Sequence, residues 1–337
     1  MKHVNFLYLF LLPVLILSSC SETTPSDSNK EPITIALRLS GDFSVDVTQD
    51  PITKVSTNDA YGINVYYDRQ GDGVTDDMYG YGLFDNVGDM SITLLSGHKY
   101  KFTCGLVKDA KNVLYFGQAF SNPYSGYAYP FQTSLSGSTL IGNRFIIGNG
   151  VYLSGIANGG VHLKNNSSPS ASNSTQYASI NRFYGETDQY EPVPNGTVDI
   201  YLKRVVFGAK FVVSGVVDGT LSVTCGDFFS KSYTNDDLGT EKIYSFTNPW
   251  DCWKNETPLS ATVSINYTSN RGGSLWNLSN SQSITFRRNV MTTVTINVSP
   301  DLSKANLSFT EEPLGDDNDI NIGINTDGLI DIIVNPS

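Results

Sequence analysis

Apolar and polar residues alternate through most of this chain with the two-residue period of β-strands. The first clear case runs from Ile33 to Leu39, where every second residue is apolar. Because successive side chains of a strand point to opposite faces, this pattern predicts a strand with one buried face. No stretch keeps the 3.6-residue period of a helix for longer than about two turns, which is too short for a stable amphipathic helix. The pattern therefore predicts an all-β protein.

Further strands are predicted wherever the alternation returns between polar or glycine-rich turns. They cover residues 43–47, 61–67, 78–84, 92–94, 99–107, 113–120, 198–202, 205–217, 221–225, 243–246, 259–267, 283–286 and 290–298. The run at 205–217 is apolar at most positions, which predicts a central strand that is covered on both faces. Short strands that follow one another at this spacing are typical of β-sandwiches.

The composition divides the chain into two halves. Residues 158–178 are rich in Gly, Ser and Asn and predict a long exposed loop or an interdomain linker, and Pro192 and Pro194 end this connection. We expect an N-terminal β-sandwich over residues 32–194 and a C-terminal β-sandwich over residues 195–315.

Two short apolar stretches follow the second predicted sandwich, within residues 316–337. The alternating isoleucines of 320–324 and the run 329–334 predict a pair of strands, with a turn at 326–328 between them. Two interpretations stay open. The pair is either an edge hairpin of the second sandwich or a donor strand that another chain accepts by strand addition.

The chain begins with a short apolar segment. Residues 6–17 are apolar, but a membrane-spanning helix needs roughly 20 apolar residues, so residues 1–19 are interpreted as a signal peptide. The sequence Leu-Ser-Ser-Cys that ends at Cys20 resembles the lipobox of bacterial lipoproteins, which implies a lipid on this thiol. Residues 20–31 would then form a lipidated polar tether, and Ser21 favours sorting to the outer membrane. The alternative is an ordinary secretory signal with a chance cysteine.

Charge and composition narrow the classes of function. The formal net charge is −11 at pH 7, which argues against binding to nucleic acid or to anionic lipid surfaces. His98 and His162 are the only histidines after Cys20, and both are predicted to lie in solvated loops. The sequence contains no nucleophile elbow, phosphate-binding loop or dinucleotide fingerprint. We therefore expect a protein that is not an enzyme.

Three of the four cysteines remain for the folded body if Cys20 is lipidated. Cys104 alternates with the apolar residues of its predicted strand and is expected to be a small buried side chain. Cys225 and Cys252 either form a disulfide across strands or stay free, and both alternatives stay open. No cysteine spacing resembles a zinc site.

One loop has the spacing of calcium ligands. Its candidate ligands offer oxygen atoms at every second position from the first to the ninth: Asp68, Gln70, Asp72, Val74 (through its carbonyl) and Asp76. The sixth position is a glycine, as in such loops, but the twelfth is a tyrosine in place of the bidentate glutamate. Calcium is thus a candidate cofactor, and the alternative, a Gly-Asp-Gly hairpin turn that binds no metal, is favoured.

Several segments, in the same order, resemble the fimbrillin-like lipoproteins of Bacteroides and Porphyromonas, a family of fimbrial subunits and fimbrial anchor or accessory proteins. Besides the lipobox, they are Ser-Gly-Asp-Phe at 40–43, Asn-Asp-Ala-Tyr-Gly-Ile at 58–63, Asp-Ile-Tyr-Leu-Lys-Arg-Val-Val at 199–206 and Arg-Asn-Val-Met-Thr-Thr-Val at 288–294. The third resembles the opening strand of the family's second domain. The resemblance covers most of the chain after Cys20 and implies two transthyretin-like β-sandwich domains in tandem.

The resemblance also implies a way of assembly. In that family a trypsin-like protease cuts after an arginine in the loop behind the first strand, and the C-terminal strand of a neighbouring subunit fills the groove that opens. In this sequence Lys54 is the only basic residue between Asp42 and Tyr61, so it is the candidate cleavage site. Two roles stay open: a stalk subunit that a broader protease cuts at Lys54, or an uncleaved anchor that keeps its lipid.

We therefore predict an outer-membrane lipoprotein that acts at the cell surface as a fimbrial (pilus) subunit or a fimbria-associated anchor or accessory protein. It would assemble with other fimbrial subunits by β-strand exchange and support adhesion to host or bacterial surfaces. The alternative is a surface glycan-binding lipoprotein of a nutrient-uptake system, with the aromatic residues Tyr127, Trp250 and Trp253 as candidate sugar-stacking groups.

Overall fold

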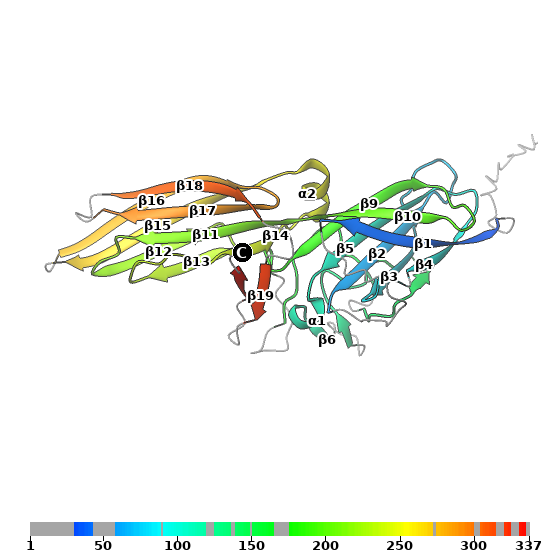
Figure 1. Cartoon of the computed structure of the whole chain (residues 1–337), viewed down its shortest axis with the longest axis horizontal. Helices are drawn as coiled ribbons and strands as arrows, with labels where there is room; N and C mark the ends of the chain where they lie inside the picture. Colours follow the sequence, from blue (N-terminus) through cyan, green and yellow to red (C-terminus); the bar gives the residue numbers. More distant parts are fainter. Residues whose placement is uncertain are drawn as a thin grey trace, which may run out of the picture.

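A computed structural model describes residues 30–42, 58–88, 90–118, 125–135, 139–148, 150–164, 175–271, 274–299, 304–314, 320–324 and 330–334. Over these residues the chain consists mostly of β-strands with two short helices, so the all-β prediction is confirmed. Figure 1 shows two lobes along the longest axis of the molecule, the first built from strands β1–β10 and the second from strands β11–β18.

The first lobe contains one eight-stranded sheet with the order β4-β1-β10-β9-β5-β2-β3-β8. Its strands are β1 (Pro32–Gly41), β2 (Ala60–Tyr67), β3 (Asp77–Phe84), β4 (Ser91–Leu95), β5 (Tyr100–Val107), β8 (Phe145–Ile147), β9 (Arg182–Tyr190) and β10 (Thr197–Arg204). The connection between β5 and β8 contains the helix α1 (Ala110–Val113) and a separate antiparallel pair, β6 (Phe116–Gln118) and β7 (Ser125–Tyr127).

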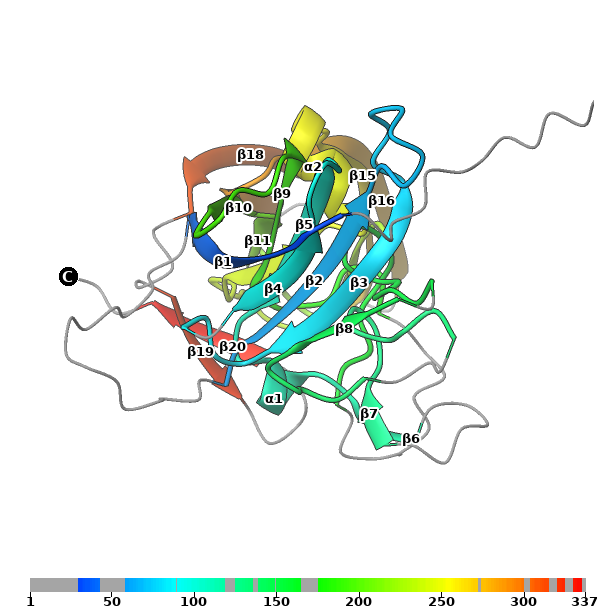
Figure 2. The same ribbon diagram turned by 90° about the vertical axis from the view of Figure 1, so that its right-hand side faces the viewer.

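The sheet of the first lobe curls, so that β4, β1 and β10 lie over β9, β5, β2 and β3 (Figure 2). A single apolar cluster between these strands contains Leu37 from β1, Ile63 from β2 and Phe102 from β5. A second cluster, which includes Leu83 and Phe131, buries the opposite face of β2, β3 and β5 beneath the connection that follows β5. The middle strands are therefore covered on both faces.

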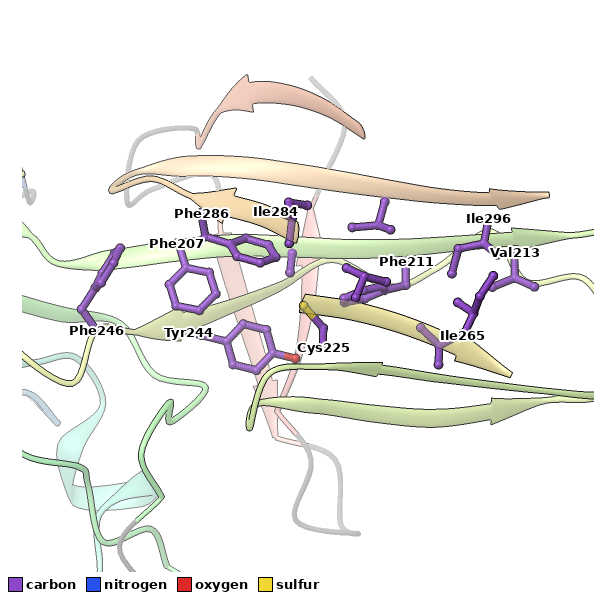
Figure 3. Close-up of a cluster of buried hydrophobic side chains, with 14 of the residues drawn as sticks. Phe207, Phe211, Val213, Cys225, Tyr244, Phe246, Ile265, Ile284, Phe286 and Ile296 are labelled. Carbon is purple, nitrogen blue, oxygen red and sulfur yellow. The ribbon is translucent and has the colours of Figure 1, made fainter. Parts of the chain in front are cut away.

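The second lobe is a sandwich of two four-stranded sheets, with the orders β14-β11-β17-β18 and β13-β12-β15-β16. Its strands are β11 (Val206–Ser214), β12 (Gly219–Cys225), β13 (Phe229–Tyr233), β14 (Lys242–Ser245), β15 (Leu259–Arg271), β16 (Ser274–Phe286), β17 (Val290–Val298) and β18 (Ala305–Pro313). Figure 3 shows the apolar side chains between the sheets. Phe207 is fully buried there, and its ring centroid lies 5.1–5.6 Å from those of Tyr244, Phe246 and Phe286.

The boundary between the lobes differs from the prediction. The sequence predicts a second domain that starts at residue 195, but β10 pairs with β1 and β9 in the first sheet. The prolines at 192 and 194 do not mark a linker, since they lie in the turn between β9 and β10, where the Gly196 amide donates to the Val193 carbonyl at 2.9 Å. The chain therefore crosses to the second lobe after Arg204.

The prediction of an exposed loop or linker over 158–178 is wrong for its described part. Val161 and Ala178 are fully buried against the first lobe. His162 is buried too, and its ring packs edge-on against Tyr129 at 5.5 Å between centroids. Main-chain hydrogen bonds hold this polar segment against the body: the Tyr115 amide donates to the His162 carbonyl (2.8 Å), and the Lys164 amide donates to the Val113 carbonyl (2.8 Å).

Arg182, which is fully buried at the start of β9, holds a loop that connects the two lobes. Its guanidinium donates hydrogen bonds to the carbonyl oxygens of Gly155 (2.6 Å), Ile156 (3.2 Å) and Gly159 (3.3 Å). The same loop reaches the second lobe, because the Gly159 amide donates to the Thr247 carbonyl at 2.8 Å. Burial lowers the pKa of Arg182 to about 10, so this side chain stays charged at neutral pH.

A short helix, α2 (Pro249–Asn255), covers the junction from the second lobe. Asn248 caps it by accepting a hydrogen bond from the Asp251 amide at 3.2 Å. The ring of Trp253 packs edge-on against Tyr184 of β9 at 5.8 Å. The sequence pattern does not predict this helix, because seven residues are too few for a helical period to be recognised.

Cys104, Cys225 and Cys252 are all free and buried. The expectation for Cys104 is confirmed, and the disulfide between Cys225 and Cys252 is not formed. Burial in apolar surroundings raises the thiol pKa of Cys225 and of Cys252 to about 12, because such surroundings disfavour the charged thiolate. These cysteines therefore act as core side chains.

The strand pair predicted near the C-terminus is present. β19 (Ile320–Ile324) and β20 (Ile330–Val334) pair antiparallel with each other and form a sheet of their own. They hydrogen-bond to neither sheet of the second lobe, and Figure 1 shows the pair outside the sandwich.

Candidate functional site

β1 links two parts of the first sheet. Residues 32–36 pair antiparallel with β4, and residues 36–41 pair parallel with β10. In the order of the described strands, β4 and β10 lie on either side of β1 and are not neighbours of each other. Loss of β1 would therefore separate β4 from the rest of the sheet.

The inward face of β1 is apolar, as the alternation predicts. Ile35, Leu37 and Leu39 are buried, whereas the side chains between them are exposed. Burying one such side chain contributes about 1.5–3 kcal/mol relative to leaving it in water. Three of them, together with the hydrogen bonds to both neighbours, hold the strand in its place.

The end of β1 requires a glycine. A Cβ atom at Gly41 would lie only 2.0 Å from the carbonyl oxygen of Leu202, so any side chain would force the two strands apart. The amide of the next residue, Asp42, donates to the same carbonyl at 3.0 Å. The Ser-Gly-Asp sequence thus fits β1 closely against β10 at the point where β10 leaves the lobe.

Asp42 fastens this end of β1 to the junction of the lobes. Its Oδ1 accepts a hydrogen bond from the Tyr201 hydroxyl (2.9 Å), and its Oδ2 accepts from the Arg204 amide (3.2 Å) and from Nη1 of Arg288 (3.3 Å). Arg288 belongs to the second lobe and also lies 3.6 Å from the Glu256 carboxylate. The hydrogen bond and the charge of Asp42 raise the pKa of Tyr201.

Replacing Asp42 with alanine is expected to lower the free energy of unfolding by about 1–2 kcal/mol, because three hydrogen bonds to a partly exposed carboxylate are lost. It should also speed hydrogen exchange at the amides of β1, as measured by mass spectrometry. Asp199→Ala is the matched control, since Asp199 pairs with Arg38 on the exposed face of the same strands. Equal exchange in the two variants would argue against a fastening role for Asp42.

Two of the predicted sites, Cys20 and Lys54, lie outside the described residues. Among the residues that are described, no helix is long and apolar enough to cross a membrane.

The structure does not bring the calcium-loop residues together. Asp68 is buried, and its carboxylate accepts a hydrogen bond from the Lys99 amide (2.7 Å) and lies 3.3 Å from Nδ1 of His98. The Asp72 carboxylate accepts from the Val74 amide within its own turn (2.9 Å). Within the described part of the chain, no three His, Cys, Asp or Glu side chains are grouped so that they could hold a metal ion.

The prediction that His98 is solvated is wrong. Its ring is buried and packs edge-on against Tyr67 at 5.2 Å between centroids. Its Nδ1 lies 2.9 Å from the Asp68 carbonyl oxygen, a distance that fits a hydrogen bond donated by the ring. The short turn before β5 folds inward to make this bond, and a solvated position was predicted only because turns are usually exposed.

The three aromatic residues named for glycan stacking make internal contacts. Tyr127 is buried and packs edge-on against Phe116 at 5.0 Å. Trp253 packs against Tyr184, and the Lys254 ammonium lies over the ring of Trp250 at 4.9 Å from its centroid. These contacts do not favour the glycan-binding alternative at these positions.

The alternation pattern does not predict the contacts of Asp42. Asp42 and Arg288 stand 246 positions apart in the chain. Both belong to segments that resemble the fimbrillin-like lipoproteins, at 40–43 and 288–294, and this shared feature is the one signal that could have linked them.

No protein family matches the sequence, and no curated protein matches it. Several solved structures are similar to it over most of its length. The fimbrial anchor protein Mfa2 from Porphyromonas gingivalis is 8% identical, with 84% of this chain and 98% of that chain covered and a TM-score of 0.36. A fimbrial assembly protein from Parabacteroides distasonis is 12% identical, with 85% and 96% covered and a TM-score of 0.30.

A third solved structure, from Bacteroides thetaiotaomicron, is named for a proposed binding of polysaccharide. It is 9% identical, with 85% of this chain and 99% of that chain covered and a TM-score of 0.32. The structures to which this chain is similar thus include fimbrial proteins of Porphyromonas and Parabacteroides.

Proposed function

We propose that this protein is a fimbria-associated lipoprotein of the outer membrane that joins other fimbrial subunits by exchange of a β-strand and supports adhesion. The observation that carries the proposal is the place of β1. Among the described residues β1 is the first strand, it lies between β4 and β10 in the strand order, and it buries one apolar face. A strand from another subunit would need backbone hydrogen bonds and pockets for every second side chain. The position of β1, between β4 and β10 and against the apolar cluster, supplies both.

The strand pair β19–β20 supports the same proposal from the other end of the chain. Its isoleucines alternate in the sequence at 320–324, the pattern that an inserted strand requires. It is paired only with itself and with neither sheet of the second lobe. On this proposal the pair opens and supplies a strand to a neighbouring subunit.

The lipid and the cleavage site complete the proposal. Cys20 carries the lipid, and residues 20–31 are the tether between the lipid and β1. Lys54 lies between β1 and β2 in the sequence. After a cut there, β1 would be held in the sheet only by its pairing with β4 and β10 and by its buried apolar face. The uncut form would be an anchor or accessory subunit, and the cut form a stalk subunit.

Deleting residues 320–337 tests the role of the strand pair. The shortened protein is expected to keep a cooperative unfolding transition and to lose its co-purification with other fimbrial subunits from the native outer membrane, because the donor strand is gone. Cys20→Ser is the matched control: it removes the lipid anchor and leaves the strand pair in place. If the shortened protein still co-purifies, or if it fails to fold, the proposed donor role is wrong.

Intact mass of the protein from native membranes separates the two roles. A species that starts at lipidated Cys20 would identify an anchor or accessory subunit. A species that starts at Val55 without lipid would identify a stalk subunit.

A further inference from the structure

A cavity of about 220 Å³ lies at one open side of the second lobe. It is formed between β13 and β14, each of which is the last strand of its sheet. Its apolar wall contains Phe211 and Phe229, whose rings stack with centroids 3.8 Å apart and an angle of 13° between planes. A cavity of this size can hold a ligand of about one sugar ring. It is smaller than the pockets that bind drug-sized molecules.

Two lysines line the cavity. On β13, Lys231 lies 2.8 Å from the Asp237 carboxylate, and its ammonium also lies over the ring of Tyr233. On β14, Lys242 makes no ion pair with any described residue. The cavity therefore offers positive charge that the protein does not neutralise, although the whole chain carries a formal charge of −11.

Two tyrosines add hydroxyl groups. Tyr233 and Tyr244 line the cavity and are only 5% and 6% exposed. Neither hydroxyl has a hydrogen-bond partner among the described residues, so both can bond to a molecule in the cavity. Burial raises the pKa of both phenols, to about 12 for Tyr244, so both hydroxyls remain available as donors at neutral pH. Thr240 contributes a further hydroxyl.

We propose that this cavity binds a small hydroxylated carboxylate, of which an acidic monosaccharide unit of a glycan is the chemical class. The ligand carboxylate would pair with the Lys242 ammonium, and its hydroxyls would bond to Tyr233, Tyr244 and Thr240. The apolar face of the sugar ring would lie against Phe229. No residue of β1 lines the cavity, so this binding does not involve the position that β1 occupies in the first lobe.

The same lysines have a simpler interpretation. Charged side chains that point inward from edge strands prevent the edges of two molecules from pairing, and Lys231 and Lys242 occupy such positions. An edge-protecting lysine needs no ligand, whereas the proposed site requires a specific response to a carboxylate sugar. The two interpretations therefore predict different outcomes in a binding experiment.

The test is a calorimetric titration of the full-length protein with sodium glucuronate, with glucose as the neutral probe. We expect saturable binding of glucuronate, weaker binding of glucose, and a loss of at least about tenfold in glucuronate affinity for Lys242→Gln. Tyr244→Phe should weaken binding as well. Lys304→Gln is the matched control, because Lys304 is exposed and lies outside the cavity.

Urea unfolding of each variant confirms that the fold is kept. Absence of saturable glucuronate binding to the unmodified protein would overturn the proposal, and so would equal losses of affinity in Lys242→Gln and Lys304→Gln. An increase of self-association in Lys242→Gln without any glucuronate binding would assign the lysines to edge protection and would overturn it too.

Discussion

Replacing Leu37 with aspartate is expected to lower the free energy of unfolding by about 3–5 kcal/mol, because it places an unpaired carboxylate inside the first lobe. Leu37 is the middle one of the three inward side chains of β1, and its surroundings are the apolar cluster that contains Ile63 and Phe102. No side chain of that cluster carries a charge that could pair with the new group. β1 should separate from β4 and β10 before the rest of the lobe unfolds.

Two measurements check this expectation: urea unfolding gives the loss of stability, and hydrogen exchange gives the protection of the β1 amides. Ala36→Asp is the matched control, since the side chain of Ala36 points to the exposed face of the same strand. Its effect should stay within about 0.5 kcal/mol. If both variants lose the same stability, the buried face of β1 is not what holds the strand.

Replacing Arg182 with alanine is expected to lower the free energy of unfolding by about 3 kcal/mol or more, because three carbonyl oxygens lose their charged donor and a large buried side chain leaves a cavity. The loop of residues 155–159 also bonds to the second lobe, through Gly159 and Thr247. Contacts between the lobes should therefore weaken together with the first lobe.

Thermal unfolding by calorimetry checks the second prediction. Arg182→Lys keeps the charge but loses the planar set of donors, so its loss should be intermediate. Arg38→Ala is the control for removal of an exposed arginine, and it should leave the midpoint nearly unchanged. If Arg182→Ala unfolds at the same temperature as Arg38→Ala, the buried guanidinium does not stabilise the junction.

Strands with one buried and one polar face were predictable from the sequence. The alternation over Ile33–Leu39 corresponds to β1, and the predicted strand at 290–298 has the same bounds as β17. In both, burial of one face imposes the two-residue period that the sequence displays. The calcium-loop spacing was less informative, because Asp68 turns inward toward the Lys99 amide and no three possible metal-ligand side chains are grouped among the described residues.

Strands with polar side chains were not predictable in this way. β9 (Arg182–Tyr190) carries several charged residues, yet it pairs with both β5 and β10. Its neighbours in the sheet make it a strand, and composition does not reveal them. The contact between Asp42 and Arg288 was not predictable either, because a single sequence gives no indication of which distant residues will meet.

The direction of β1 has a mechanical consequence. β1 runs parallel to β10, which leads into the second lobe, so β1 begins at the outer end of the first lobe and ends at the junction (Figure 1). A load applied at Lys30 and resisted by the second lobe would pull along the axis of the strand. The hydrogen bonds to β4 and β10 run across that axis, so the load would shear them together instead of unzipping them one by one. Tension on a tether before Lys30 would thus act on β1 in the direction in which the strand resists most strongly.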